Sequence, residues 1–222
     1  MDLEVRNLSK KYERGGRTFS AVKDVDLEVK GGDFISIVGQ SGSGKSTLLN
    51  LIAGLLLPTS GEILIDGKSA VTSSDREASE LRNTVIGHIP QGQSLLSSLT
   101  VYDNIRLPFY LSDREGDPDK KTLELLANLG IADLADSYPN SLSGGEARRV
   151  AIARSLINKP DILLADEPTG DLDKENTDEI ISLFRRIAKE GTTVIMVTHD
   201  PDTEDAADRS YTMSNGSLLQ KI

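Results

Sequence analysis

The sequence predicts an α/β fold, and three observations support this prediction. An apolar run at residues 34–38 leads into a glycine-rich segment at 39–47 and then into a helical pattern. A second apolar run, at residues 162–165, ends in two consecutive carboxylates, Asp166 and Glu167. A mostly helical block lies between these two runs, at residues 94–159. Strands and helices in this order predict a sheet covered by helices, with functional groups at strand ends.

Composition restricts the class of protein. The 222 residues suffice for one sizeable domain with a full core. With 35 acidic and 25 basic side chains, the net charge of −10 repels phosphate backbones, so we expect no nucleic-acid partner. The absence of cysteine and the presence of only two histidines argue against disulfides and against thiolate or histidine-rich metal centres. The longest apolar run, residues 51–57, is shorter than the ~20 residues that span a membrane, and the acidic residues 1–4 show no signal pattern. We therefore expect a soluble, cytoplasmic chain.

The first 38 residues have a strand-like pattern. Residues 3–6 and 25–29 alternate apolar and polar side chains, and glycine pairs at 15–16 and 31–32 indicate turns. Tyr12 lies at the end of the first predicted strand, in a polar stretch. Its ring could cover a sheet edge, or it could be a flat surface on which adenine stacks. Its position is compatible with both.

The segment GQSGSGKST matches the phosphate-binding P-loop pattern, in the required order of strand, glycine-rich turn and helix. Its glycines let successive N–H groups point at one anion, and the helix that follows adds its positive end. We expect Lys45 to reach the β- and γ-phosphates and the Ser46 hydroxyl to bind Mg²⁺. A turn that matches by chance would not need the flanking strand and helix. The predicted nucleotide-binding residues are Gly39, Gln40, Ser41, Gly42, Ser43, Gly44, Lys45, Ser46 and Thr47.

The segment after the P-loop predicts two strands and three helices. A strand is expected at residues 62–65, and Ser74 with Glu77 has the spacing of a capping box at a helix start. A buried strand is expected at 84–89, and helices at 100–111 and 119–128. Gln91 follows the buried strand. It is either a polar strand end or, at the carboxyl edge of the sheet, a carboxamide that completes a Mg²⁺ shell.

A second glycine cluster precedes a predicted helix at residues 147–157. Ser143 can cap this helix, and Gly144 and Gly145 leave the amides at its head accessible. An ordinary capped helix explains the pattern. An anion site explains the pattern as well. Because no lysine follows this cluster, such a site would suit the γ-phosphate of a nucleotide that is held elsewhere, by a second copy of the chain.

Two further segments carry candidate catalytic groups. Burying adjacent carboxylates is costly unless their charge is used, so we expect Asp166 to hold Mg²⁺ through water and Glu167 to face the attacking water. A β-branched strand at residues 192–198 places His199 at its carboxyl end. A lone histidine is usually structural. A closing hairpin with a turn at residues 215–216 is expected after it.

The sequence LSGGE at residues 142–146 closely resembles the LSGGQ signature of the ATP-binding cassette (ABC) ATPases, and the resemblance extends from Tyr12 to His199. It implies an α/β P-loop NTPase (RecA-like) core with an antiparallel β subdomain and an α-helical signature subdomain. It also implies one domain over residues 1–222, with the core and β subdomain at 1–90 and 160–222 and the helical subdomain at 91–159.

The resemblance assigns roles to individual residues. Asp166 closes the Walker B motif, Glu167 is the catalytic glutamate, and His199 is the switch histidine that contacts the γ-phosphate. Asp173 takes the aspartate position of the D-loop, and the resemblance favours adenine stacking for Tyr12. In this family two subunits pack head to tail, so that each ATP lies between one P-loop and the signature of the partner.

The sequence DEPTGDLD at residues 166–173 resembles the DEPTGNLD version of the macrolide-export and lipoprotein-release group, although Asp171 replaces the usual asparagine. Relatives of this group include antimicrobial-peptide transporters and a cell-division ATPase. The implied function is ATP hydrolysis that powers a separate membrane permease, with the chain on the inner face of the cell membrane. The permease would contact the region around Gln91 and the helical block.

Three alternatives remain at this point: a soluble ABC-type ATPase acting on nucleic acid or ribosomes, a cell-division regulatory ATPase, and a small-molecule kinase. DNA-repair members carry long coiled coils, and sustained heptads are missing here. Ribosomal members usually carry two cassettes in a chain. A kinase would not need the cluster at residues 143–145.

Overall fold

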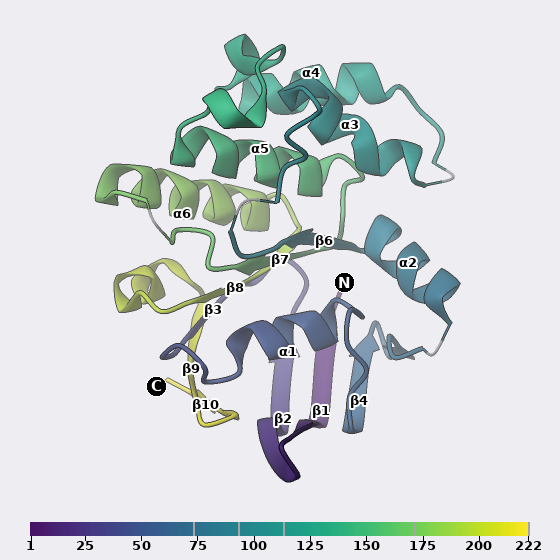
Figure 1. The fold of residues 1–222 in the computed structure, drawn as a ribbon, viewed down its shortest axis with the longest axis vertical. Coiled ribbons are helices and arrows are strands. Elements are labelled where there is room, and N and C mark those ends of the chain that lie inside the picture. Colours follow the sequence, from purple (N-terminus) through teal and green to yellow (C-terminus); the bar gives the residue numbers. More distant parts are fainter. Residues whose placement is uncertain (73, 93, 113, 171, 222) are drawn as a thin grey trace.

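The computed structural model describes residues 1–72, 74–92, 94–112, 114–170 and 172–221, and it confirms the α/β class (Figure 1). Two sheets lie on either side of helix α1 (Lys45–Ile52). The larger sheet has six strands, in the order β10-β9-β3-β8-β7-β6. Their bounds are β3 (Phe34–Val38), β6 (Ile86–Ile89), β7 (Ile162–Asp166), β8 (Thr193–Thr198), β9 (Arg209–Ser214) and β10 (Ser217–Gln220).

The larger sheet is parallel from β6 to β9, and only β10 runs antiparallel, as the second strand of a hairpin. Every residue of β3, β7 and β8 is buried, because helices or the second sheet cover both faces of these strands. Asn215 and Gly216 join β9 to β10 with φ angles of 49° and 86°, so the predicted hairpin turn is confirmed.

The smaller sheet is antiparallel, in the order β2-β1-β4-β5. Its strands are β1 (Leu3–Arg14), β2 (Arg17–Val29), β4 (Ser60–Ile65) and β5 (Lys68–Ser69). β1 and β2 are much longer than the predicted 3–6 and 25–29. Three register shifts interrupt their pairing, and these break the apolar alternation from which the sequence-based bounds were drawn.

The helical block covers the opposite face of the larger sheet (Figure 1). It contains α3 (Val101–Tyr110), α4 (Pro118–Asn128), α5 (Gly144–Leu156) and two 3₁₀ turns, η1 (Ala132–Leu134) and η2 (Pro139–Ser141). Helix α6 (Lys174–Lys189) lies between α5 and the sheet, and its buried residues share a core with those of α3 and α5. A separate core joins α1 to both sheets. No described helix combines the length and the apolarity that crossing a bilayer requires.

Several predicted boundaries require correction. Ser74 caps α2 (Asp75–Thr84), but the Glu77 side chain bonds the Thr72 hydroxyl, so the predicted capping box is not formed. The strand predicted to start at residue 84 starts at Ile86, because Thr84 remains in α2 and its hydroxyl donates to Glu80 O. Helix α5 starts at residue 144 rather than 147, because a capping box joins Ser143 to Glu146.

Candidate functional site

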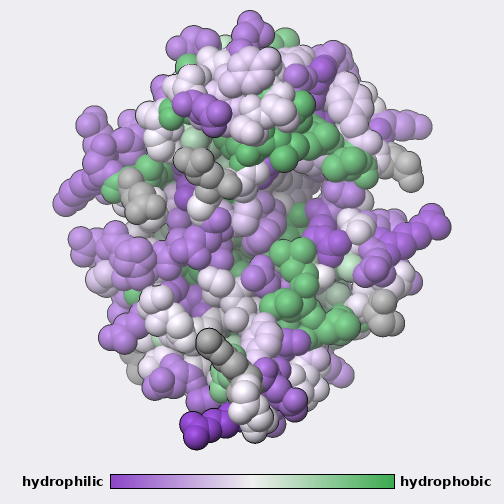
Figure 2. All heavy atoms as spheres, in the orientation of Figure 1, coloured by the Kyte–Doolittle hydropathy of each residue, from purple (hydrophilic) through white to green (hydrophobic). Residues whose placement is uncertain are grey.

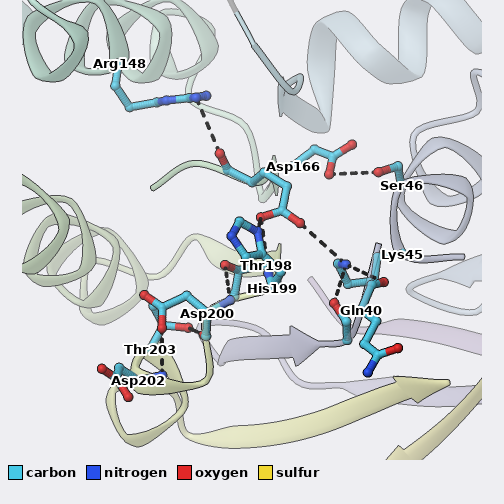
Figure 3. Close-up of polar contacts among 12 residues, drawn as sticks. Gln40, Lys45, Ser46, Arg148, Asp166, Thr198, His199, Asp200, Asp202 and Thr203 are labelled. Atoms are coloured by element: carbon cyan, nitrogen blue, oxygen red, sulfur yellow. Dashed lines mark hydrogen bonds and ion pairs between the residues drawn. The ribbon is translucent and has the colours of Figure 1, made fainter. Parts of the chain in front are cut away.

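Three adjacent parallel strands bring the predicted site together. β3 leads into the P-loop, β7 ends at Asp166 just before Glu167, and β8 ends just before His199. Since the carboxyl ends of parallel strands meet at one sheet edge, residues 120 positions apart become neighbours: Ser46 Oγ donates to Asp166 Oδ1 at 3.0 Å (Figure 3).

The P-loop backbone depends on its glycines for two different reasons. Gly42 and Gly44 have φ angles of 77° and 110°, which residues with a Cβ rarely adopt. A Cβ on Gly44 would also collide with Ala21 O, and one on Gly39 with Met213 O. β2 and β9 therefore hold the loop in place from outside. The turn of the last hairpin also contacts the P-loop, since Gly216 N donates to Ser43 O at 2.9 Å.

Lys45 lies at the centre of the site. Its side chain is 5% exposed, and its Nζ donates to Gly39 O at 2.6 Å and to Gln40 O at 3.2 Å. It also lies 3.4 Å from Glu167 Oε1. A buried ammonium surrounded by carbonyl and carboxylate oxygens is a fixed positive charge at the mouth of the loop.

Asp166 and Glu167 are both buried but are held differently. Burial raises the pKa of the Asp166 carboxyl, and the hydrogen bond from Ser46 opposes this effect. Glu167 Oε2 accepts from His199 N at 3.2 Å and lies 2.7 Å from His199 Nδ1 (Figure 3). The backbone of Glu167 is in the left-handed region, with φ 48°, and its N–H donates to Val197 O at 2.9 Å.

A groove of about 950 Å³ lies in front of these groups. Most predicted nucleotide-binding residues line it. Of the P-loop residues, Gly39, Gln40 and Ser43 do not. The predicted residues on its wall are Tyr12, Ser41, Gly42, Gly44, Lys45, Ser46, Thr47, Gln91, Glu167 and His199.

The structure adds seven groove residues that the sequence analysis missed: Glu13, Phe19, Ser20, Ala21, Lys23, Asn215 and Gly216. Phe19 pairs with Tyr12 across β1 and β2, and the two rings stack with centroids 5.6 Å apart. A hairpin centred on the predicted turn at residues 15–16 places residue 19 opposite residue 12, so this pair could have been found. The contact of Gly216 with the P-loop and the place of Asn215 in the groove wall had no local signal.

The second glycine cluster lies outside this groove. Ser143 caps α5, and its N–H donates to Glu146 Oε2 at 2.7 Å. Gly144 lines a separate cavity of about 180 Å³, and a Cβ on Gly145 would collide with Asn176.

Asp173 also lies outside the groove, as the N-cap of α6, where it accepts from Asn176 N at 2.9 Å. That hydrogen bond lowers the pKa of Asp173. Asp171 lies outside the described residues. Within one chain, the structure therefore separates Ser143, Gly144, Gly145 and Asp173 from the Lys45 groove.

The fold and the site define a P-loop nucleoside triphosphatase, because a glycine-rich loop, a buried lysine and the two carboxylates at the end of a second strand meet at one edge of the sheet. A family model described as "ABC transporter" matches residues 22–170. The chain belongs to the ABC transporter family and has the fold of its ATPase cassettes, which confirms the predicted RecA-like P-loop core and the assignment as an ATPase.

Individual relatives support this assignment. The chain is 41% identical to the ABC transporter ATP-binding protein YvrO of Bacillus subtilis, over 98% of this chain and 95% of that protein. It is 41% identical to the lipoprotein-releasing system ATP-binding protein LolD of Bordetella avium, again over 98% and 95%. It is 42% identical to the macrolide export ATP-binding/permease protein MacB of Chlorobaculum tepidum, but spans only 33% of that protein.

Solved structures agree. A dimeric post-hydrolysis state of the ATP-binding cassette MJ0796, bound to ADP and Pi, superposes with a TM-score of 0.91 and 36% identity, over 99% of this chain and 97% of that one. These similarities place the chain in the macrolide-export and lipoprotein-release group that its motifs resemble.

Proposed function

We propose that the chain binds and hydrolyses ATP in the Lys45 groove, together with a second copy of itself, and that hydrolysis powers a separate membrane permease. One observation carries this proposal. Lys45, Ser46, Asp166, Glu167 and His199 come from three separate strand ends and meet at one edge of the sheet.

The bound triphosphate would lie along the P-loop, with its negative charge facing Lys45 and the N-terminus of α1. Glu167 would then orient the attacking water and accept its proton. The two contacts from His199 to Oε2 hold the glutamate in place, and they leave Oε1 directed toward Lys45. His199 is 65% exposed at the groove wall, where its ring can reach the terminal phosphate.

The residues of the groove fit a Mg²⁺ ion. Asp166 presents a buried carboxylate beside the Ser46 hydroxyl, and burial disfavours its charge, as expected where a cation would compensate it. Ser46, Asp166 and Gln91 offer only oxygen ligands, which Mg²⁺ prefers. Bound there, the ion would neutralise part of the phosphate charge.

Tyr12 and Phe19 would receive the adenine base. Both rings line the groove, and they pair with each other near the tip of the β1–β2 hairpin. Stacking on a flat aromatic face needs no specific hydrogen bonds.

A second chain would complete the site. Ser143 and Gly144 are exposed at the head of α5, beside the buried Gly145 and outside the Lys45 groove, so this helix head would meet a nucleotide phosphate only from another molecule. Head-to-tail packing of two copies would bring this helix head, and Asp173, to the partner's groove. The dimeric MJ0796 cassette, bound to ADP and Pi, supports this arrangement.

We propose that the permease docks beside α2, and that the chain is held in this way on the inner face of the membrane. Asn83 donates to Leu111 O at 3.1 Å and Arg82 to Gly54 O at 2.9 Å, so α2 joins the end of α3 to the segment after α1. Leu111, Leu55 and Leu57 on these segments are exposed. Figure 2 shows apolar side chains gathered both over the helical block and over the part of the molecule below it.

The experiment that tests the catalytic assignment is Glu167→Gln. The variant should bind ATP with an affinity within about twofold of the parent, lose at least 100-fold in turnover, and accumulate as an ATP-bound dimer. Calorimetry, phosphate release and size-exclusion chromatography with ATP measure the three effects. Unchanged turnover would remove Glu167 from the catalytic role.

A further inference from the structure

Arg148 connects two regions of the chain that the proposed function assigns to different ATP molecules. It lies on α5, five residues after the cap Ser143, whose helix head would face the ATP of the partner. Its side chain reaches the segment after β7, where Nη2 donates to the main-chain oxygen of Glu167 at 3.4 Å (Figure 3). Glu167 serves the ATP of its own chain. One side chain therefore bridges the helix of one site and the catalytic residue of the other.

The contact reaches Glu167 where its backbone is under strain. A φ of 48° is unfavourable for a residue with a Cβ and persists only if neighbouring groups hold it. Its N–H is held by Val197 O. Its carbonyl accepts from Gly170 N at 3.2 Å and from Arg148. Of these three contacts, only the one from Arg148 comes from the helical block, so a displacement of α5 acts directly on the glutamate backbone.

The surroundings of Arg148 permit such a displacement. The cavity of about 180 Å³ beside it is lined by Gly144 from the head of α5, by Gly92 from the loop after β6 and by Gly170 from the loop after Glu167. Since the interior there is not filled, small shifts of these segments do not force a repacking of the core.

We propose that Arg148 is a positioning residue that couples the two ATP sites of the dimer: α5, drawn toward the partner's ATP, sets the Glu167 backbone of its own chain through Arg148. The proposal rests on the proposed function, because it requires two composite sites. It predicts that hydrolysis is cooperative in ATP and that the cooperativity depends on the Arg148 guanidinium.

The test compares Arg148→Met with Arg149→Met. Methionine keeps an unbranched apolar stem but removes the donors. Arg149 is the neighbouring arginine of the same helix, but it contacts Leu129 O and Glu179 instead. Arg148→Met should lower kcat about tenfold, which is the loss expected for a hydrogen bond from a charged group. Its Hill coefficient should approach 1, and its ATP affinity should stay within about twofold of that of the parent. Arg149→Met should keep the Hill coefficient, and Arg148→Lys should restore a third or more of the rate.

A spectroscopic measurement separates positioning from general loss of structure. The chain has only two histidines, and His199 contacts the Glu167 carboxylate whereas His88 lies in β6. In Arg148→Met the imidazole ¹⁵N resonances of His199 should move while those of His88 stay. Arg149→Met should leave both in place. If Arg148→Met does not fold, Arg148→Gln is judged by the same criteria.

A Ser143→Ala change examines the transmission itself. If Arg148 carries the signal, the fold-loss in kcat that Ser143→Ala causes should be at least five times smaller in the Arg148→Met protein than in the parent. The proposal is overturned if Arg148→Met retains the parent's rate, Hill coefficient and His199 resonances, or if Arg149→Met reproduces the same losses. Either outcome leaves the proposed function intact provided that Glu167→Gln still abolishes turnover.

Discussion

Lys45 and Glu167 form an ion pair in which both side chains are almost completely buried, at 5% and 11% exposure. Removing either partner would leave an uncompensated charge away from water, which is costly. The pair therefore keeps both charged groups in place beside the P-loop. At the residue scale, stability and binding depend on the same few groups.

Phe19 should contribute to base binding. Base–aromatic stacking is worth about 1–3 kcal/mol per ring, so Phe19→Ala should weaken ATP binding by roughly 5- to 150-fold. Calorimetry with ATP measures the loss, and inorganic tripolyphosphate, which has no base, should bind both proteins equally. Phe19→Trp, which keeps an aromatic face, is the matched control. An equal loss for tripolyphosphate would contradict a role in stacking.

His88 should make the fold sensitive to acid. Burial lowers the pKa of His88, and its Nε2 has no hydrogen-bond partner among the described residues. The unfolded chain therefore binds a proton below about pH 6.5 that the folded chain resists, and stability falls with decreasing pH by up to about 1.4 kcal/mol per pH unit. Urea unfolding at pH 7.5 and 5.5 should show a smaller loss for His88→Gln than for the parent. Equal losses would show that other groups cause the acid sensitivity.

At the scale of single elements, the head of α5 combines a side-chain cap with an exposed helix N-terminus. The Ser143 hydroxyl accepts from Glu146 N, and Glu146 Oε2 accepts from Ser143 N. This reciprocal cap satisfies two backbone donors. The hydrogen bond from Ser143 N also lowers the pKa of Glu146, so the carboxylate is charged at neutral pH.

Glu146→Gln should preserve this cap, because a carboxamide oxygen also accepts from Ser143 N. We expect an ATPase rate within about twofold of the parent and a melting temperature within about 2 °C. Glu146→Ala removes the acceptor and should lower the melting temperature by about 2–4 °C. Scanning calorimetry and phosphate release measure these effects. A Glu146→Gln variant as damaged as Glu146→Ala would show that the charge itself is needed.

At the scale of the whole molecule, the Lys45 groove and the head of α5 lie on different parts of one chain, and the proposed function assigns them to the two halves of a shared site. The Lys45 groove lies where both sheets and α1 meet, whereas Ser143 belongs to the helical block. Under the proposed function, a second molecule would complete each half. This is the arrangement expected of a symmetric dimer with two equivalent sites.

Mixing two inactive variants tests this arrangement. Lys45→Ala removes the cation of one half, and Ser143→Arg blocks the other. Mixed in equal amounts with ATP, they should recover at most about a quarter of the parental ATPase rate, because half of the dimers are mixed, each of these has one intact site, and coupling between the sites lowers the rate of a single site. Titrating one variant into the other while following phosphate release provides the measurement. Parental turnover by either folded variant alone, strictly per monomer, would refute the shared site.

Much of the site was predictable because its signals are local. A strand, a glycine-rich turn and a helix identify the P-loop, and two carboxylates after an apolar run identify the catalytic strand. The turn at Asn215–Gly216 was equally readable. In each case a few neighbouring residues determine the backbone conformation, so no other part of the chain is needed to interpret them.

Other features depend on contacts between distant parts of the chain, and only the tertiary structure decided them. β9 joins the larger sheet beside β3, the register shifts set the length of β1 and β2, and Arg148 reaches Glu167 from another element. By itself, the sequence determined the chemistry of the groups and the order of the elements. Which groups meet depended on the packing of helices against sheets, because side chains far apart in sequence are brought together only when buried surfaces fit.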